Sequence, residues 1–240
     1  MNRIGKAIIL GLMALVLSPG PGRTACLEGD CVNGQGVFAG DKGRYEGGFQ
    51  DGRPSGLGVW TSPEGRYEGQ FENGQPSGAG TWTTTAGDVL AGQFQNGKAN
   101  GQGTWTGVDG SRYTGMFEND QPSGQGTWIG ADGNKIVGEF KAGQANGQGR
   151  WFGTDGRTYE GQFVNGRFEG QGTLKMADGG EYSGEFRDGK PEGQGELRPA
   201  QGGNYVGEFV NGKPEGRGEL LGPDGARLTG QFKDGQYVGP

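Results

Sequence analysis

Residues 67–82 read YEGQFENGQPSGAGTW, and a close copy of this stretch begins again about every 23 residues along the 240-residue chain. The spacing between units is 22 residues once and 23 residues thereafter. The units begin at Tyr45, Tyr67, Leu90, Tyr113, Ile136, Tyr159, Tyr182, Tyr205 and Leu228. Self-similarity at a fixed period of this length predicts a repeat architecture in place of an ordinary compact domain.

Aromatic side chains recur at fixed positions inside each unit. Four positions after each start stands Phe49, Phe71, Phe94, Phe117, Phe140, Phe163, Phe186, Phe209 or Phe232. Fifteen positions after the start stands Trp60, Trp82, Trp105, Trp128 or Trp151, and then Leu174, Leu197 or Leu220. Disordered glycine-rich linkers have no such spacing, so we expect these side chains and the unit-starting tyrosines to form structural aromatic columns.

Alternation within the unit predicts strands. In YEGQF the side chains of Tyr67 and Phe71 share one face of an extended chain, and in GAGTW Gly80 and Trp82 do the same. Pairs such as 73–74 (Asn-Gly) and 109–110 (Asp-Gly) indicate hairpin turns, because both central residues can adopt positive φ. The sequence therefore predicts an all-β fold, an elongated single-layer antiparallel β-meander of about nine solenoid-like hairpin repeats and about 17 strands.

The glycines suggest a packing scheme. If two strands pair about the first turn, the Tyr position lies opposite Trp and the Phe position opposite the first glycine of the second strand. Each strand glycine costs about 0.5 to 1 kcal/mol, whereas each well-buried aromatic side chain stabilises by about 1.5 to 3 kcal/mol. The other face carries Glu46, Glu68 and Glu160 beside glutamines, and is interpreted as a solvated face, with a polar recognition surface as the alternative.

The unit Y-E-G-x-F-x-N-G-x-x-x-G-x-G-x-W closely resembles the MORN (membrane occupation and recognition nexus) repeat across residues 33–240. Residues 33–38, NGQGVF, look like the second strand of a decayed leading unit. The departures are Leu90, Ile136 and Leu228 in place of Tyr, Asp120 in place of the turn glycine, and leucine for Trp in the last three complete units. The resemblance implies a repeat surface that acts on partners or on membranes.

The N-terminal residues have the pattern of an export signal. Arg3 and Lys6 precede the 11-residue apolar run AIILGLMALVL, which is too short to cross a bilayer. We therefore divide the chain into a signal peptide (1–25), an N-terminal cap (26–44) and the repeat array (45–240), and expect cleavage and a periplasmic, cell-surface or secreted location. Export permits a Cys26–Cys31 disulfide. Lipid attachment at Cys26 is the open alternative.

Composition excludes several functional classes. The chain has no histidine, which removes Ser-His-Asp and Cys-His nucleophile pairs and most zinc sites. Loss of residues 1–25 removes three of the 22 basic residues and no acid, leaving 19 basic residues against 28 acidic ones. That balance, without a basic cluster, argues against nucleic acid. We expect no enzyme activity, no metal, no cofactor and no small-molecule substrate.

Three functions remain. The first is a non-enzymatic exported scaffold that binds a protein partner, or a second copy of itself through the edge strand at residues 237–240 or the neighbouring leucine surface. The second is a membrane or phospholipid-surface module, with Trp105 and Trp128 at the headgroup level. The third is glycan or cell-wall binding by exposed aromatic rings. The sequence does not identify the partner.

Overall fold

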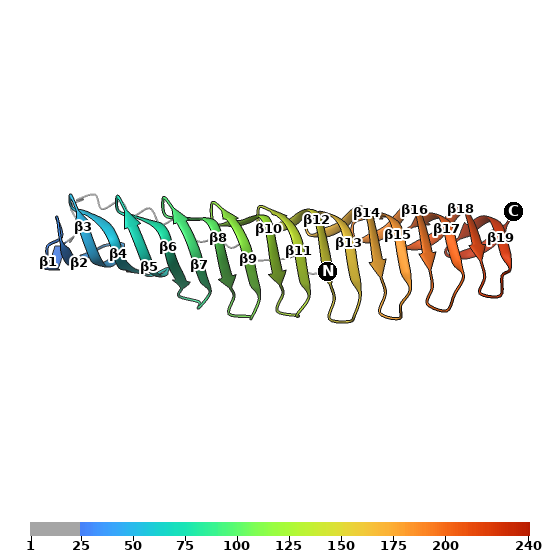
Figure 1. Ribbon diagram of the computed structural model, residues 1–240, viewed down its shortest axis with the longest axis horizontal. Coiled ribbons are helices and arrows are strands. Elements are labelled where there is room, and N and C mark those ends of the chain that lie inside the picture. The colour runs from blue at the N-terminus through green and yellow to red at the C-terminus, as the bar shows by residue number, and fades with distance from the viewer. Residues whose placement is uncertain (1–24) are drawn as a thin grey trace. The chain divides into compact units, whose positions relative to one another are not determined.

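The computed structural model describes residues 25–240, which divide into two compact units, 25–131 and 132–240. The expected signal segment lies outside the described residues except for Ala25. Within that range every regular element is a strand, and the strands follow one another in chain order (Figure 1). The prediction of an all-β antiparallel meander is confirmed in each unit.

Each unit consists of ten strands that pair with their chain neighbours. The first contains β1 (Ala25–Gly29), β2 (Gln35–Gly40), β3 (Gly43–Gln50), β4 (Arg53–Ser62), β5 (Gly65–Glu72), β6 (Gln75–Thr84), β7 (Val89–Gln95), β8 (Lys98–Thr106), β9 (Arg112–Glu118) and β10 (Gln121–Ile129). The second contains β11 (Lys135–Lys141), β12 (Gln144–Phe152), β13 (Thr158–Val164), β14 (Arg167–Lys175), β15 (Glu181–Arg187), β16 (Lys190–Arg198), β17 (Asn204–Val210), β18 (Lys213–Leu221), β19 (Arg227–Lys233) and β20 (Gln236–Gly239). Strands β2 and β20 coincide with the expected strand of the decayed leading unit and the expected edge strand, whereas β1 was not predicted.

The first turn of each repeat behaves as the sequence predicts. Asn73 has φ of 51° and Gly74 has φ of 82°, so both central residues are left-handed, as a tight type I′ hairpin requires. The Gly74 amide then donates to the carbonyl of Pro54 in the preceding repeat at 2.9 Å. Ala142 occupies the Asn position with φ of 49°, in a region that suits Asn or Gly better than Ala.

Asp120 shows how the array accommodates the missing turn glycine. Its φ is 69°, and its buried carboxylate accepts a hydrogen bond from the Ala99 amide at 2.7 Å. Burial raises the pKa of the Asp120 carboxyl. The equivalent of Ala99 in the two preceding repeats is proline, at Pro54 and Pro76, which has no amide proton to satisfy.

The second turn differs from the expectation. At residues 107–111 only Gly110 adopts positive φ, whereas the sequence interpretation assigned it to Asp109 as well. The Gly110 amide donates to the Gly107 carbonyl at 3.0 Å, and the Asp109 carboxylate accepts the Ser111 amide at 2.9 Å. The longer loop is a turn followed by one left-handed glycine. Asp109 therefore stabilises the turn through the hydrogen bond that its carboxylate accepts and does not itself adopt a left-handed φ.

The strand register is also partly different. Tyr67 lies opposite Trp82, as predicted, and Gly69 lies opposite Gly80, but a bulge then places Phe71 opposite Pro76. Phenylalanine does face the first glycine, but across the other turn, where Gly78 pairs with Phe94 of the next repeat. The bulge arises because Gly78 has φ of 62°, which breaks the extended geometry.

Tyrosine rings close the core by lying on bare glycine backbone. The Tyr67 side chain is fully buried, and its hydroxyl donates to the Gln70 carbonyl at 3.1 Å. Its ring meets Phe71 of the same repeat at 5.1 Å and Phe94 of the next repeat at 5.0 Å, both edge to face. Adjacent repeats therefore bury each other's rings, which is what a lone hairpin could not do.

Most of the predicted aromatic columns are buried. The buried members are Tyr45, Phe49, Trp60, Tyr67, Phe71, Trp82, Phe94, Tyr113, Phe117, Phe140, Trp151, Tyr159, Phe163, Tyr182, Phe186, Tyr205, Phe209 and Phe232. Trp105 and Trp128 are half-buried and stack on each other with ring centroids 5.6 Å apart. Leu228 in the last repeat is 40% exposed, whereas Leu90 and Ile136, which also replace tyrosine, are 1% and 4% exposed.

Candidate functional site: a groove on the polar face

The face opposite the aromatic columns contains a groove at the start of the first unit. Its volume is about 590 Å³, and it crosses β1 to β5. The lining residues are Glu28, Gly29, Gln35, Gly36, Val37, Glu46, Gly47, Leu57, Gly58, Val59, Glu68 and Gly69. This surface is where the chain presents both apolar and charged side chains around a hollow.

One wall of the groove is a row of alternating acidic and apolar residues. Glu28 lies opposite Val37, and Val37 lies opposite Glu46 on the next strand. Glu46 in turn faces Val59, which faces Glu68. Five consecutive strands thus place Glu, Val, Glu, Val and Glu side by side, because side chains directly opposite each other share a face. We call these five residues the Glu-Val row.

The floor and the other wall are also defined by residue type. Glycine backbone at Gly36, Gly47 and Gly58 forms part of the floor, and Gln35 and Leu57 stand beyond it. Leu57 is 72% exposed, although the next repeat has the small Ala79 at the same position and later repeats have polar residues such as Gln102 and Gln125. An exposed leucine in an otherwise small or polar column indicates a contact surface.

The same row changes character beyond β5. The residues that continue it across β6 to β10 are Thr81, Ala91, Thr104, Thr114 and Thr127. The alternation of carboxylate and valine is therefore confined, within the first unit, to its N-terminal end.

A shorter Glu-Val-Glu alternation occurs in the second unit, at Glu196, Val206 and Glu219. There the carboxylates are occupied. Glu196 accepts two hydrogen bonds from Arg198 at 2.8 Å and one from Asn204 at 2.9 Å, and these bonds lower the pKa of Glu196. Glu219 is bound by Arg227.

The carboxylates of the groove are more available. Arg44 pairs with Glu46 at 2.9 Å, and Arg66 pairs with Glu68 at 2.5 Å. Both glutamate side chains nonetheless remain about 60% exposed (59% and 61%), against 27% for Glu196. No ion pair to Glu28 is found within residues 25–240. Exposed ion pairs of this kind contribute about 0 to 1 kcal/mol, so an incoming cation can replace them.

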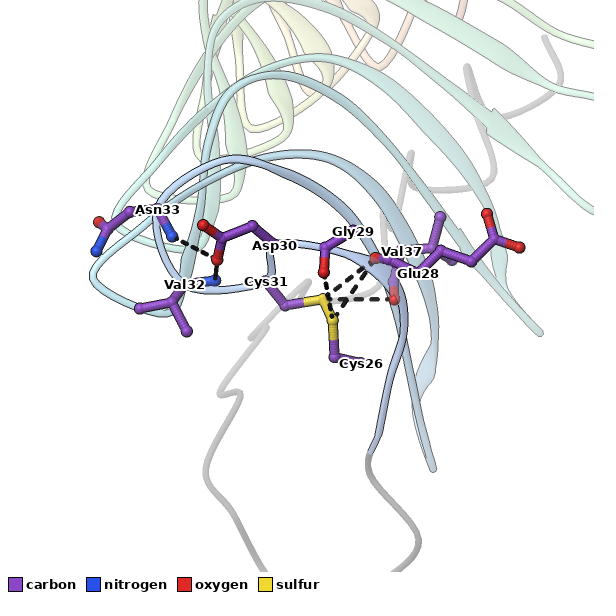
Figure 2. Close-up of a disulfide and its surroundings, with 8 residues drawn as sticks. All are labelled: Cys26, Glu28, Gly29, Asp30, Cys31, Val32, Asn33 and Val37. Carbon is purple, nitrogen blue, oxygen red and sulfur yellow. Dashed lines mark hydrogen bonds between the residues drawn. A yellow bond between two sulfur atoms is a disulfide. The ribbon is translucent and has the colours of Figure 1, made fainter.

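The disulfide fixes the strand that carries Glu28. Cys26 and Cys31 are joined with a Cα–Cα distance of 5.9 Å, and Figure 2 shows the bridge beside the Glu28, Gly29 and Val37 backbone. The Cys31 sulfur lies 3.5 Å from the Val37 carbonyl oxygen. Asp30 closes the loop inside the bridge by accepting the Val32 and Asn33 amides at 2.8 and 3.0 Å, and these bonds lower the pKa of Asp30.

Sequence reasoning anticipated part of this site. It identified the cysteine pair and placed Glu46 and Glu68 on the polar face, which it interpreted as a solvated face with a polar recognition surface as the alternative. It did not single out Glu28, Val37, Leu57 or Val59. The signal was present, because Leu57 and Val59 stand where the next repeat has Ala79 and Thr81. Only the cross-strand register shows that they flank the same carboxylates.

Among residues 25–240 no group of three or more acidic or cysteine side chains is arranged to hold a metal ion. The described part of the chain also has no helix with the length and apolar character needed to cross a bilayer.

The sequence model of the MORN repeat matches eight consecutive segments: residues 45–65, 67–89, 91–112, 113–135, 137–156, 159–181, 182–201 and 205–227. These matches cover most of the chain. Together with the tyrosine rings that pack against strand glycines in successive hairpins, they define a repeat protein. The chain belongs to the MORN repeat family. A comparison with curated protein sequences found no match.

Several solved structures share general features of the chain. The TCP10 domain of Danio rerio CPAP, in complex with a STIL peptide, is 12% identical over 88% of this chain and 99% of that one, with a TM-score of 0.48. The SAS-4 (dCPAP) TCP domain of Drosophila melanogaster, in complex with a proline-rich motif of Ana2, is 11% identical over 65% and 85%, with a TM-score of 0.41. A virginiamycin B lyase from Staphylococcus aureus is 12% identical over 88% and 73%, with a TM-score of 0.16. At these scores the likeness carries no inference about ligand or activity.

Proposed function

We propose that this MORN repeat protein is a non-enzymatic interaction module that binds an extended segment of a partner protein in the groove over β1 to β5. The observation that carries the proposal is the 590 Å³ groove, whose wall includes the 72% exposed Leu57. A concave surface with apolar contacts and a few directed polar groups is a typical binding site. Repeat arrays commonly use such extended surfaces for recognition.

The proposal places this interaction outside the cytoplasm. The apolar run at residues 7–17 supports export, and the Cys26–Cys31 bridge is chemistry that an oxidising compartment maintains. A mature chain that starts close to Cys26 would present the groove at its N-terminal end. Mass spectrometry of the protein recovered from culture medium and periplasm would locate the cleavage site and show whether Cys26 is lipidated.

A second contact surface is proposed at β20. This four-residue strand pairs with β19 through Gln236 and Tyr237, and the neighbouring Val238 is 62% exposed. An edge strand of this kind is a template for pairing with a strand of another chain or of a second copy. A sedimentation coefficient that rises with concentration, and that no longer rises in a Val238→Pro variant, is the expected result for a homodimer through this edge.

Selection of peptides from a random library displayed on phage tests the groove. We expect the selected peptides to lose binding to a Leu57→Asp variant and to retain it on Val108→Asp, a matched change at a 66% exposed valine outside the groove. Equal binding to both variants would refute the proposal. Flotation of the protein with neutral or anionic vesicles, unaffected by Leu57→Asp, would favour the lipid-surface function.

A further inference from the structure

The groove has a spacing that selects one kind of peptide. We propose that it binds a polyproline II segment with a basic side chain at every third residue, the cations pairing with Glu28, Glu46 and Glu68. The inference rests on the proposed function, because it specifies the partner of that same groove. It is carried by the register of the Glu-Val row together with the exposure of its carboxylates.

The distance between the carboxylates decides the conformation of the ligand. Glu28, Glu46 and Glu68 lie on β1, β3 and β5, so consecutive members are two strands apart. Neighbouring strands are about 4.8 Å apart, which gives about 9.6 Å between successive glutamates along the row. A polyproline II helix rises about 3.1 Å per residue, so every third side chain recurs after about 9.3 Å on the same edge.

A β-strand ligand does not fit the same row. Side chains on one face of a strand recur every second residue, after about 6.6 Å. This spacing does not match the distance of about 9.6 Å between successive glutamates, so the second ligand cation would already miss its carboxylate. A polyproline II segment laid across the strands also needs no backbone partners from the groove, since it makes no internal hydrogen bonds and is ordinarily solvated. The interior strands β2 to β5 have none to give, because each pairs with a strand on both sides.

Apolar residues between the cations have matching contacts. Val37, which is 8% exposed, and the half-buried Val59 alternate with the glutamates on one wall, and the 72% exposed Leu57 stands on the other. The two ligand residues between the cations at Glu46 and Glu68 therefore meet aliphatic side chains on both sides, whereas those between Glu28 and Glu46 meet Val37 on one side and Gln35 on the other. The preference is for small apolar residues or proline at these positions, because the floor is glycine backbone at Gly47 and Gly58.

Arg44 and Arg66 are the competing cations. They come from the same strands as Glu46 and Glu68 and hold them in exposed ion pairs. A ligand lysine exchanges with such a pair at little cost, because both partners are already solvated. Glu28 has no ion pair within residues 25–240, so a ligand cation there displaces no arginine of the described chain. The Glu196 site lacks this availability, since Arg198 and Asn204 already bind its carboxylate.

The test is fluorescence anisotropy of the mature protein with three labelled synthetic peptides. The first repeats Lys-Pro-Val; the second has the same composition with lysines at alternate positions; the third repeats Glu-Pro-Val. We expect binding of the first, about tenfold weaker binding of the second, and none of the third. The double variant Glu46→Gln/Glu68→Gln should bind the Lys-Pro-Val peptide about tenfold more weakly, because the loss of each exposed ion pair reduces the affinity by about two- to fivefold. Glu118→Gln, an exposed glutamate on β9 outside the groove, should change nothing.

The outcomes separate this inference from the function it rests on. If library-selected peptides need Leu57 but the Lys-Pro-Val peptide does not bind, or binds the double variant equally, the spacing inference fails and the groove remains a peptide site. If the two lysine peptides bind equally, the polyproline II geometry is wrong. If spermidine displaces the Lys-Pro-Val peptide at the same concentration as unlabelled peptide, only charge is recognised and the inference also fails.

Discussion

Replacing Gly80 by alanine tests whether the Tyr67 ring needs a glycine at the position against which it packs. A Cβ at Gly80 would lie 2.2 Å from the Tyr67 hydroxyl oxygen and 2.4 Å from Cζ of the ring. Gly103 occupies the same position one repeat later, where Leu90 replaces the tyrosine, and its nearest contacts would be the Ala91 carbonyl oxygen and Phe117 Cδ2, both at 3.2 Å. Neither glycine has positive φ, so the two substitutions differ in the ring alone.

The magnitude follows from the surroundings of Tyr67. The side chain is fully buried between Phe71 and Phe94 and has no room to withdraw. Overpacking of this kind costs about 1 to 3 kcal/mol, and expelling the ring instead would lose about 1.5 to 3 kcal/mol of burial. Alanine in a strand recovers about 0.5 to 1 kcal/mol relative to glycine. We expect Gly80→Ala to lower the free energy of unfolding by about 1 to 2 kcal/mol and Gly103→Ala to change it by less than about 1 kcal/mol.

Urea denaturation followed by far-ultraviolet circular dichroism and tryptophan fluorescence measures both variants. The urea midpoint should fall for Gly80→Ala while the dependence of the unfolding free energy on urea concentration stays the same. An unchanged slope shows that the variant exposes the same surface on unfolding and differs only in stability. The Tyr67→Leu variant copies the Leu90 and Gly103 pair of the next repeat, so adding Gly80→Ala to it should cause little further loss. Equal destabilisation by Gly80→Ala and Gly103→Ala would refute the reasoning.

Three further predictions concern the turns, the tyrosines and the cap. Ala142→Asn should raise the urea midpoint, because it removes about 1 kcal/mol of left-handed strain at φ of 49°; an unchanged or lower midpoint would contradict this. Burial raises the pKa of Tyr45, Tyr113, Tyr159 and Tyr182 from 10 to about 12, so their stabilising contribution is complete below pH 10 and is lost as pH rises through 12. Tyrosinate absorbance should therefore appear together with loss of sheet circular dichroism, and ionisation of these residues in a fully folded sheet would be inconsistent with their burial. Cys26→Ser/Cys31→Ser should remove about 2 kcal/mol of local stability by opening a short loop. Hydrogen exchange should then quicken at β1 and β2 and stay unchanged at β8 and β9, whereas uniform quickening would contradict a local role for the bridge.

The repeat period and the hairpin strands could be predicted because they depend on local chemistry. Alternation places Tyr67 and Phe71 on one face whatever the neighbours are, and Asn73-Gly74 has few conformations other than a tight turn. The MORN resemblance rested on the same residues, and the family match confirms it.

The register could not be predicted from the unit alone. The bulge at Gly78 depends on a left-handed φ that glycine permits but does not require. It moves Phe71 from the expected glycine to Pro76 and pairs Gly78 with the next repeat. In the second turn, the Asp109 carboxylate accepts a hydrogen bond from the Ser111 amide. An Asp-Gly pair in the sequence does not show whether Asp is present for this hydrogen bond or for a left-handed φ.

The groove was missed for a related reason. Its members come from five strands, and only Glu46 and Glu68 share a repeat position, since Glu28 and Val37 lie in the cap and Val59 stands where the next repeat has Thr81. The departure of one repeat from its neighbours at Leu57 was the available signal. In repeat proteins, positions that break the repeat on an exposed face therefore merit the first test as binding residues.

The claim on which the fold depends is that rings of adjacent repeats stabilise one another. A double-mutant cycle at Tyr67 and Phe94, with each replaced by leucine singly and together, measures that coupling directly in the urea denaturation assay. The edge-to-face contact at 5.0 Å predicts a coupling free energy of about 0.5 to 1.5 kcal/mol. Additive losses, within about 0.3 kcal/mol, would show that each repeat holds its rings alone and would contradict this account.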